Sequence, residues 1–195
     1  MGLIDLYTRQ ATMMQNQLHS LEQVPVICPE VVRSLQKSLR SVKAEIRKLE
    51  HELQQLLHTW QGEQVKSIGS IPGLGKRAVA LLIVYTEGFT KVQNHRQLIA
   101  LAGLAPREHT SGTSVRGRKG ICKMGNGYLR NVLYMCSLSA IKHNEACKEL
   151  YDRLKGKGKR GKVALIAVCN KLLKQAFAIA TKKTMYLPNY KSALA

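Results

Sequence analysis

Hydrophobic residues follow a strict helical spacing over the first third of the chain. Between residues 32 and 60 they recur at alternating intervals of three and four, the heptad pattern of a coiled-coil helix. The positions are Val32, Leu35, Leu39, Val42, Ile46, Leu49, Leu53, Leu56 and Trp60. Pro29 suits the first turn of this helix, and Gln61 with Gly62 ends it. The pattern predicts a long helix whose apolar seam must meet a second helix.

A shorter helix is predicted for residues 4–21, before the prolines at positions 25 and 29. It offers Leu6, Met13, Leu18 and Leu21 for burial. The seam of the long helix could meet this segment folded back, or the same helix of a second chain. The first segment is too short to cover the seam fully, so we favour a homo-oligomer formed through the coiled coil. A helix packed only on its own domain remains the alternative.

The remaining apolar patterns predict short helices joined by turns. Helices are expected at residues 94–101, 127–143, 145–154 and 163–182, the last as the core helix. Leu129, Val132, Leu133 and Met135 form the expected apolar side of the second of these. We therefore predict a mainly α fold, a long coiled-coil helix followed by a compact helical domain. The expected boundaries are 1–64 for the coiled-coil and dimerisation region, 65–183 for the compact domain and 184–195 for a loose tail.

Charge divides the chain into two parts. Its net charge is +19, yet residues 1–65 hold seven Lys and Arg against seven Asp and Glu, whereas residues 66–195 hold 24 against five. Such a basic part suggests a polyanionic partner. We expect nucleic acid and no membrane partner, because no apolar run approaches about 20 residues and no helix joins a cationic face to a bulky apolar one. Five cysteines without C-x-x-C spacing support neither a disulfide framework nor a zinc site, and a reducing cytoplasm fits them best.

The segment 107–130 combines hydroxyl groups, glycines and cations. Its hydroxyl cluster is Thr110, Ser111, Thr113 and Ser114, and its cations include Arg107, Arg116, Arg118, Lys119 and Lys123. Glycines let a backbone approach a partner closely. Cations beside hydroxyl groups are what a loop that handles a phosphodiester would carry. An ordinary solvated basic loop is the alternative.

Two further segments suggest phosphate contacts. Residues 68–82 are typical of a helix-hairpin-helix, in which Gly73 and Gly75 would expose backbone N–H groups at a helix N-terminus and Lys76 and Arg77 would reinforce the contact. A plain αα-corner needs the same glycines. The run KGKGKRGK at residues 155–162 is glycine-spaced and basic, so Lys159, Arg160 and Lys162 are candidate phosphate ligands, unless it is only a solvated linker.

In order, these motifs resemble a known family. They are S-I-P-G-L-G at 70–75, L-A-G-L-A-P-R at 101–107, S-G-T-S-V-R-G at 111–117, K-M-G at 123–125, L-R-N-V-L-Y-M at 129–135 and G-K-R-G-K-V at 158–163. The chain from about residue 65 to 180 resembles the C-terminal half of insertion-sequence transposases with a DEDD domain and a catalytic serine. These are the bridge-RNA-guided recombinases, which also include pilin-gene invertases.

The resemblance implies a specific chemistry for the basic loop. The family's nucleophile is the first serine of the third motif, which corresponds to Ser111. Arg116 and Lys123 match family positions and Arg107 flanks the motif, so these three form the expected phosphate clamp, with Arg118 and Lys119 as further nucleic-acid contacts. The implied partners are DNA and a structured guide RNA, in the bacterial cytoplasm at the nucleoid. His109 is expected to contact phosphate or solvent rather than to activate Ser111.

The chain departs from the family pattern in its acids. The family's RuvC-like domain holds Mg²⁺ through four acidic residues, whereas Asp5 and Asp152 are the only aspartates here and the glutamates are scattered. We therefore expect no metal site and no cofactor in this chain, with Mg²⁺ entering only through the missing RuvC-like domain. Alone, the chain is expected to bind nucleic acid without cleaving it. A non-catalytic binding module for DNA or RNA, and a scaffold for acidic proteins, are the alternatives.

Overall fold

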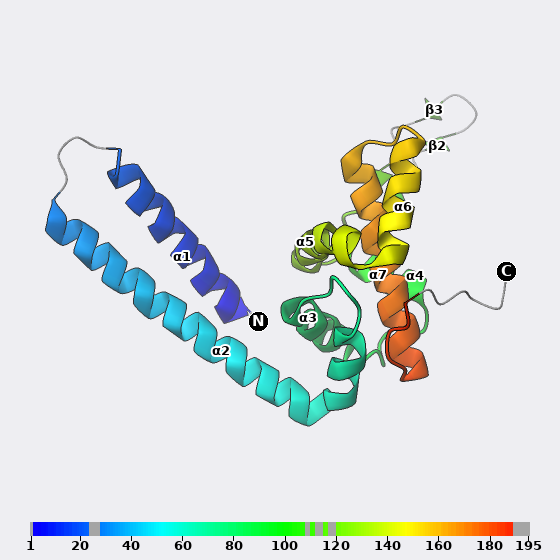
Figure 1. The fold of residues 1–195 in the computed structure, drawn as a ribbon, viewed down its shortest axis with the longest axis horizontal. Helices are drawn as coiled ribbons and strands as arrows, with labels where there is room; N and C mark the ends of the chain where they lie inside the picture. The colour runs from blue at the N-terminus through cyan, green and yellow to red at the C-terminus, as the bar shows by residue number, and fades with distance from the viewer. Residues whose placement is uncertain (1, 24–27, 108–109, 112–114, 117–119, 189–195) are drawn as a thin grey trace. The chain divides into compact units, whose positions relative to one another are not determined.

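The computed structural model describes residues 2–23, 28–107, 110–111, 115–116 and 120–188 (Figure 1). Seven helices occupy most of these residues, and four strands of two residues each lie in one segment. The mainly α fold predicted from the sequence is thus confirmed. The chain divides into two compact units, Met1–Thr59 and Trp60–Ala195, which we describe separately.

The first unit is a hairpin of two helices, α1 (Gly2–Leu21) and the larger part of α2 (Pro29–Gly69). Near the connection between them, both helices line an open cavity of about 650 Å³. The lining residues are Gln17, Ser20 and Leu21 of α1, and Glu30, Val31, Ser34 and Leu35 of α2. Most of the predicted seam, from Val32 to Leu53, is only half-buried. The hairpin therefore covers its apolar seam incompletely.

The predicted seam is wrong at its C-terminal end. Leu56 is 69% exposed and Trp60 is also exposed, whereas Leu57 is only 3% exposed. A straight α-helix has 3.6 residues per turn, so its buried stripe drifts away from a strict heptad. After Leu49 and Leu53, the next covered position is therefore Leu57.

The expected buried face of α1 is also corrected. Leu6 and Met13 are exposed, and the buried side chains of this helix are Ile4 and Ala11. Leu18 and Leu21 are half-buried. The covered positions 4, 11, 18 and 21 follow heptad spacing, in which Leu6 and Met13 have no place.

The long helix continues beyond the end predicted at Gln61 and Gly62. Gln61 does have a non-helical backbone (φ −141°, ψ 42°), but helical geometry resumes and α2 ends at Gly69. Ile68 is completely buried in the second unit, and Gln64 Nε2 donates to the Gly88 carbonyl at 3.0 Å. These contacts stabilise the additional turns, which local spacing alone did not reveal.

The second unit is built around its last helix, α7 (Gly161–Lys182). This helix contacts α4 (His95–Leu101), α5 (Gly127–His143) and α6 (Glu145–Gly156), and α3 (Lys76–Thr86) packs on α5. The prediction of a C-terminal core helix is confirmed. By length and composition α7 could also span a membrane, a property that the search for apolar runs missed, but half of that stretch is buried inside the protein.

The apolar side of α5 is shifted from the predicted one. Leu129 and Leu133 are buried as expected, but Met135 is exposed and Cys136 and Ala140 are buried instead. The spacing from Leu129 through Leu133, Cys136 and Ala140 is four, three and four residues, so these side chains share one face of the helix. Met135 lies outside that face.

Asn144 joins four segments of the second unit. Its side chain caps α6 by accepting from the Cys147 N–H at 3.2 Å, and it also accepts from the Tyr186 hydroxyl at 3.1 Å. Its amide donates to the Pro72 carbonyl at 3.3 Å and to Gln175 Oε1 at 3.1 Å. With 1% of its surface exposed, Asn144 needs all of these partners, because an unpaired buried amide is costly.

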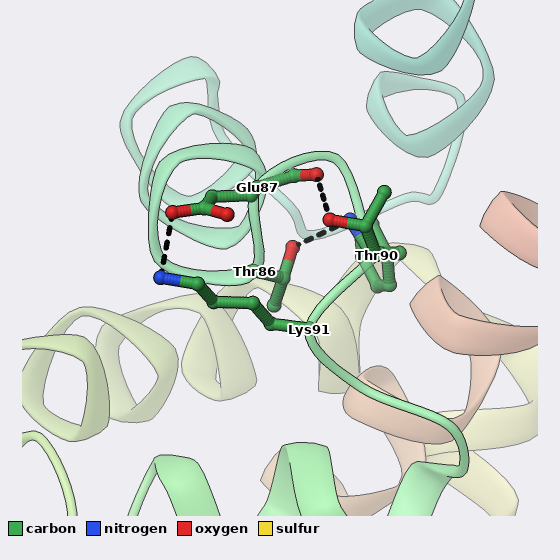
Figure 2. Close-up of polar contacts among 5 residues, drawn as sticks. Thr86, Glu87, Thr90 and Lys91 are labelled. Atoms are coloured by element: carbon green, nitrogen blue, oxygen red, sulfur yellow. Dashed lines mark hydrogen bonds and ion pairs between the residues drawn. The ribbon is translucent and has the colours of Figure 1, made fainter.

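The turn after α3 holds an unusual backbone. Glu87, Gly88 and Phe89 have φ values of 48°, 66° and 67° in succession. This is the left-handed region of backbone conformation, which residues other than glycine disfavour. Figure 2 shows the contacts that hold it: Thr86 Oγ1 accepts from the Phe89 N–H at 3.0 Å, and Lys91 Nζ lies 2.6 Å from Glu87 Oε1. The Thr90 hydroxyl also donates to the Glu87 carbonyl at 2.8 Å. These bonds fix the path from α3 toward α4.

Candidate nucleic-acid interface

The basic segment after α4 contains two short antiparallel ladders. β1 (Pro106–Arg107) pairs with β4 (Gly120–Ile121), and β2 (Thr110–Ser111) pairs with β3 (Val115–Arg116). The sequence predicts a loop here, because two-residue strands are too short to show a period in hydrophobicity. We call these four strands, β1 to β4, the hairpin arm.

Ser111 is the last residue of β2, and its partner in the ladder is Val115. Arg116 is paired with Thr110, the residue before Ser111. The backbones of the expected nucleophile and of one expected phosphate ligand are therefore adjacent across the ladder. Two other expected contacts, Arg118 and Lys119, lie outside the described residues, as does His109.

Two of the predicted phosphate ligands lie at the base of the hairpin arm. Arg107 is exposed on β1 and its ladder partner is Gly120. Lys123 is exposed two residues after β4, with a φ of 59°. The backbone N–H of Lys123 donates to the Gly103 carbonyl at 3.0 Å, which ties the end of the arm to the turn after α4. Both side chains are thus accessible while their backbone is fixed.

The base is closed by two glycines from different motifs. A Cβ on Gly103 would lie 2.8 Å from the Gly125 nitrogen and 2.5 Å from Arg130 Nη1. Gly103 also has a φ of 67°, so only glycine fits this position without strain. Asn126 N–H donates to the Leu101 carbonyl at 2.7 Å, and Asn126 Oδ1 caps α5. The motifs at 101–107 and 123–125 therefore form one compact support.

Arg130 is a residue of this support that the sequence analysis did not single out. It is half-buried, and its Nη1 donates to the Ala102 carbonyl at 3.1 Å. Its role could have been suspected from the motif L-R-N-V-L-Y-M, in which an arginine lies on the partly buried side of a helix. We assign it a positioning role, because it joins the first turns of α5 to the turn from which the arm leaves.

The predicted helix-hairpin-helix residues lie around the turn before α3 and fall into two groups, those that contact the protein and those that are exposed. Gly73 has a φ of 97°, and a Cβ there would lie 2.6 Å from that of Ala140. Arg77 Nε donates to the Tyr128 hydroxyl at 2.6 Å and its guanidinium lies 5.5 Å from the ring centre. These two residues serve contacts within the protein. By contrast, Lys76 is exposed and a Cβ on Gly75 would meet no atom within 4 Å.

The basic run between α6 and α7 is a tight, exposed connection. Lys159, Arg160 and Lys162 are all exposed. Gly158 has a φ of 72°, and the Lys159 N–H donates to the Leu154 carbonyl at 3.0 Å, as in a Schellman ending. The connection (residues 155–162) therefore presents its cations from a defined turn.

The buried thiols do not offer a second reactive centre in the described part of the chain. Burial raises the pKa of Cys147 to about 12 and that of Cys169 to about 11, and it also raises the pKa of Cys136. These thiols stay neutral and unreactive near neutral pH. Among the described residues, no three His, Cys, Asp or Glu side chains converge.

Comparison with known proteins finds relatives of a large part of the second unit. Residues 65–152 match the transposase IS116/IS110/IS902 family. The chain is 33% identical over 113 residues to the pilin gene-inverting protein of Moraxella lacunata, covering 57% of this chain and 35% of that protein. It is 28% identical over 127 residues to the transposase for insertion sequence element IS1111A of Coxiella burnetii, covering 64% and 35%.

A third relative is an uncharacterized 43.6 kDa protein of the insertion element IS110 in Streptomyces coelicolor, 30% identical over 117 residues, or 60% of this chain and 29% of that protein. The chain thus spans about one third of the length of the curated relatives it matches. The matched region includes the turn before α3, the glycine support and the hairpin arm. The match of residues 65–152 and the relatives found support an IS110-type transposase C-terminal domain in this part of the chain, as its motifs predicted.

Proposed function

We propose that this chain supplies the DNA-binding and strand-transferring domain of a transposase or site-specific recombinase, with Ser111 as the nucleophile. The observation that carries the proposal is the position of Ser111 in a hairpin arm whose base is locked by Gly103, Gly125 and Arg130. Exposed Arg107 and Lys123 flank that base. The relatives' names, pilin gene inversion and transposition, describe rearrangements of DNA.

The proposed reaction is a transesterification at a DNA phosphate. The Ser111 hydroxyl oxygen attacks phosphorus, a serine–phosphate bond forms, and the bond from phosphorus to one deoxyribose oxygen breaks. The serine proton passes to a base, and the departing oxygen takes up a proton. Attack by a serine requires a base or a metal, and the Mg²⁺ expected with the family's RuvC-like domain would supply this activation. Arg107, Arg116 and Lys123 would stabilise the negative charge that develops on the phosphate oxygens.

A covalent adduct assay tests this assignment. The chain is combined with the metal-binding domain of the family, target DNA and guide RNA, and the protein–DNA adduct is measured on a denaturing gel. Ser111→Ala should abolish the adduct. Ser114→Ala, which removes a hydroxyl group three residues further along the sequence, should retain it. If Ser111→Ala forms as much adduct as the parent, Ser111 is not the nucleophile.

A second candidate is a non-catalytic nucleic-acid-binding module. It is supported by the open surface at Gly75 and Lys76, where a helix N-terminus could receive a phosphate. If the chain is such a module, Ser111→Ala leaves its affinity for nucleic acid unchanged, while Lys76→Gln weakens binding. If about six phosphates are contacted, the log–log salt slope should lie near −5 on duplex DNA. A flat salt response would contradict both candidates.

The proposal includes two partners besides DNA. A structured guide RNA is expected from the family resemblance, and it is tested by competition between RNA and target DNA for the purified chain. A second copy of the chain is expected on the half-buried seam of α2, which α1 covers incompletely. Light scattering at several concentrations tests it, with Leu39→Lys expected to shift the protein to monomer and Lys37→Gln as the exposed control.

A further inference from the structure

A groove between α6 and α7 carries charges that the proposed function does not use. It is open, with a volume of about 530 Å³, and lies outside the hairpin arm. Its lining residues are Ala146, Glu149, Leu150 and Arg153 of α6, and Ala167, Asn170, Lys171 and Lys174 of α7. Each set follows the spacing i, i+3, i+4, i+7, so one continuous face of each helix forms one wall.

Three cations and one carboxylate face this groove. Arg153, Lys171 and Lys174 give a net charge of two with Glu149 included. Within the described part of the chain, none of these four side chains makes a hydrogen bond or an ion pair within 4 Å. Lys171 is also half-buried, and keeping an ammonium group partly away from water without a partner is unfavourable. Such an arrangement is stabilised when an anion enters.

The groove is continuous with the basic connection. Since α6 ends at Gly156 and α7 begins at Gly161, the valley between the two helices leads to residues 157–160. From the start of α7 to Lys174 is about 20 Å of helix. Each DNA strand carries a phosphate about every 3.4 Å along the helix axis. The cations of the groove and the connection are thus spread over a length that several successive phosphates would occupy.

We propose that the α6–α7 groove binds the sugar–phosphate backbone of duplex DNA, as an extension of the contact made by the basic connection. This inference rests on the proposed function for the identity of the polyanion. Arg153, Lys171 and Lys174 contact phosphate oxygens, and the Asn170 amide adds a neutral hydrogen-bonding group to the wall. Glu149 opposes binding because it places a carboxylate among the phosphates. The groove positions DNA and reads no bases.

The test uses opposite charge changes inside and outside the groove. Duplex DNA binding to the full chain is measured at several salt concentrations for Arg153→Gln, Lys171→Gln, Lys174→Gln and Glu149→Gln. The first three should weaken binding by about threefold or more and reduce the salt slope by about 1 each. Glu149→Gln should tighten binding about twofold. Thermal unfolding confirms that each variant is folded, and Arg153 and Lys174 are exposed, so those two variants decide the matter if Lys171→Gln unfolds.

Matched controls lie on the outer face of α6. Lys148 and Asp152 are exposed and do not line the groove, so Lys148→Gln and Asp152→Asn should leave affinity and slope close to those of the parent. Groove variants that behave like these controls overturn the inference, as does weakening seen only with a duplex RNA of equal length. If the groove variants match the controls while Lys159→Gln and Arg160→Gln still weaken binding, this inference fails and the proposed function stands. A parent chain that binds no DNA contradicts both.

Discussion

The two compact units of this chain bury their side chains to very different degrees. Within the described residues of the first unit, only Ile4, Ala11 and Leu57 are buried apolar side chains, although that unit carries the most regular hydrophobic pattern of the sequence. The second unit has a less regular pattern and contains the remaining buried core. Regular spacing therefore marks a surface that one chain covers only in part, whereas an irregular pattern marks helices packed on several sides.

Charge divides the chain at nearly the same place, about six residues after the boundary between the units. The first 65 residues are neutral in sum and the remaining residues carry the whole excess of +19. A nearly neutral hairpin with an incompletely covered seam is suited to another protein surface, and a compact basic unit is suited to a polyanion. The comparison predicts that mutations in the second unit act on folding and nucleic-acid binding, while mutations on the half-buried seam of the first act on assembly.

The largest expected effect is at Gly73, in the turn before α3. Gly73→Ala should destabilise the second unit by about 3 kcal/mol, because its φ of 97° and its contact with Ala140 both reject a Cβ. Urea unfolding followed by circular dichroism measures the loss. Gly75→Ala, in the same turn but facing open space, should cost at most about 1 kcal/mol. Equal losses for the two variants would contradict the assignment of Gly73 to packing.

A graded effect is expected at the asparagine helix caps. Asn144→Ala should cost about 2–3 kcal/mol, since it removes a cap and also removes one hydrogen-bond partner each from Gln175 and Tyr186. Asn126→Ala removes a cap for α5 alone and should cost about 1 kcal/mol. Thermal unfolding ranks the two. The same cost at both sites would show that the bonds joining the four segments contribute nothing beyond capping.

Adjacent leucines in α2 test the corrected seam. Leu57→Ala should cost about 2 kcal/mol because the side chain is buried, whereas Leu56→Ala should change stability by less than about 0.5 kcal/mol because that side chain is exposed. Both helical propensity and residue type are identical in the pair, so the difference reports burial alone. The reverse order would restore the heptad seam that the sequence analysis predicted.

The helices were predictable because their signals are local. Pro29 at the start of α2, the Asn144 cap and the apolar faces of α5 and α7 each lie within a few residues of what they determine. The errors occur where a distant contact decides. Met135 was placed on the apolar side by spacing, yet Cys136 and Ala140 are buried instead, and Ala140 lies against Gly73 from a distant segment. In the same way, α2 continues past Gln61 to the completely buried Ile68.

The candidate site was predictable in composition and only partly in geometry. Arg107, Lys123, Lys76 and the basic connection are exposed as a binding role requires. Arg77 and Gly73 have the residue types of a phosphate-binding turn, yet both are used for contacts with α5 that no local pattern indicates. The pairing of Ser111 with Val115 and the contact of Gly103 with Gly125 join residues whose approach no local pattern indicates.

The smallest expected effect is a dependence of stability on pH, caused by buried thiols of the second unit. Burial raises the pKa of Cys147 from 9.0 to about 12 and that of Cys169 from 9.0 to about 11. Below pH 9 both thiols are neutral in the folded and the unfolded chain, so their contribution to stability is fully present. As pH rises above 9 the unfolded chain releases these protons first, and that stability is progressively lost.

Because of each raised pKa, the free energy of unfolding of the second unit should fall by about 1 kcal/mol per thiol between about pH 8 and pH 10. Melting temperatures measured across that range with a non-thiol reductant show the loss. Cys147→Ala should make the pH dependence shallower even if it lowers stability at every pH, because the buried titrating group is gone. Cys28→Ala removes an exposed thiol of the first unit and should leave the slope unchanged. If the melting temperature of Cys147→Ala depends on pH as steeply as that of the parent, this thiol is hydrated in the folded protein. The two units would then differ less in burial than the packing of α6 against α7 indicates.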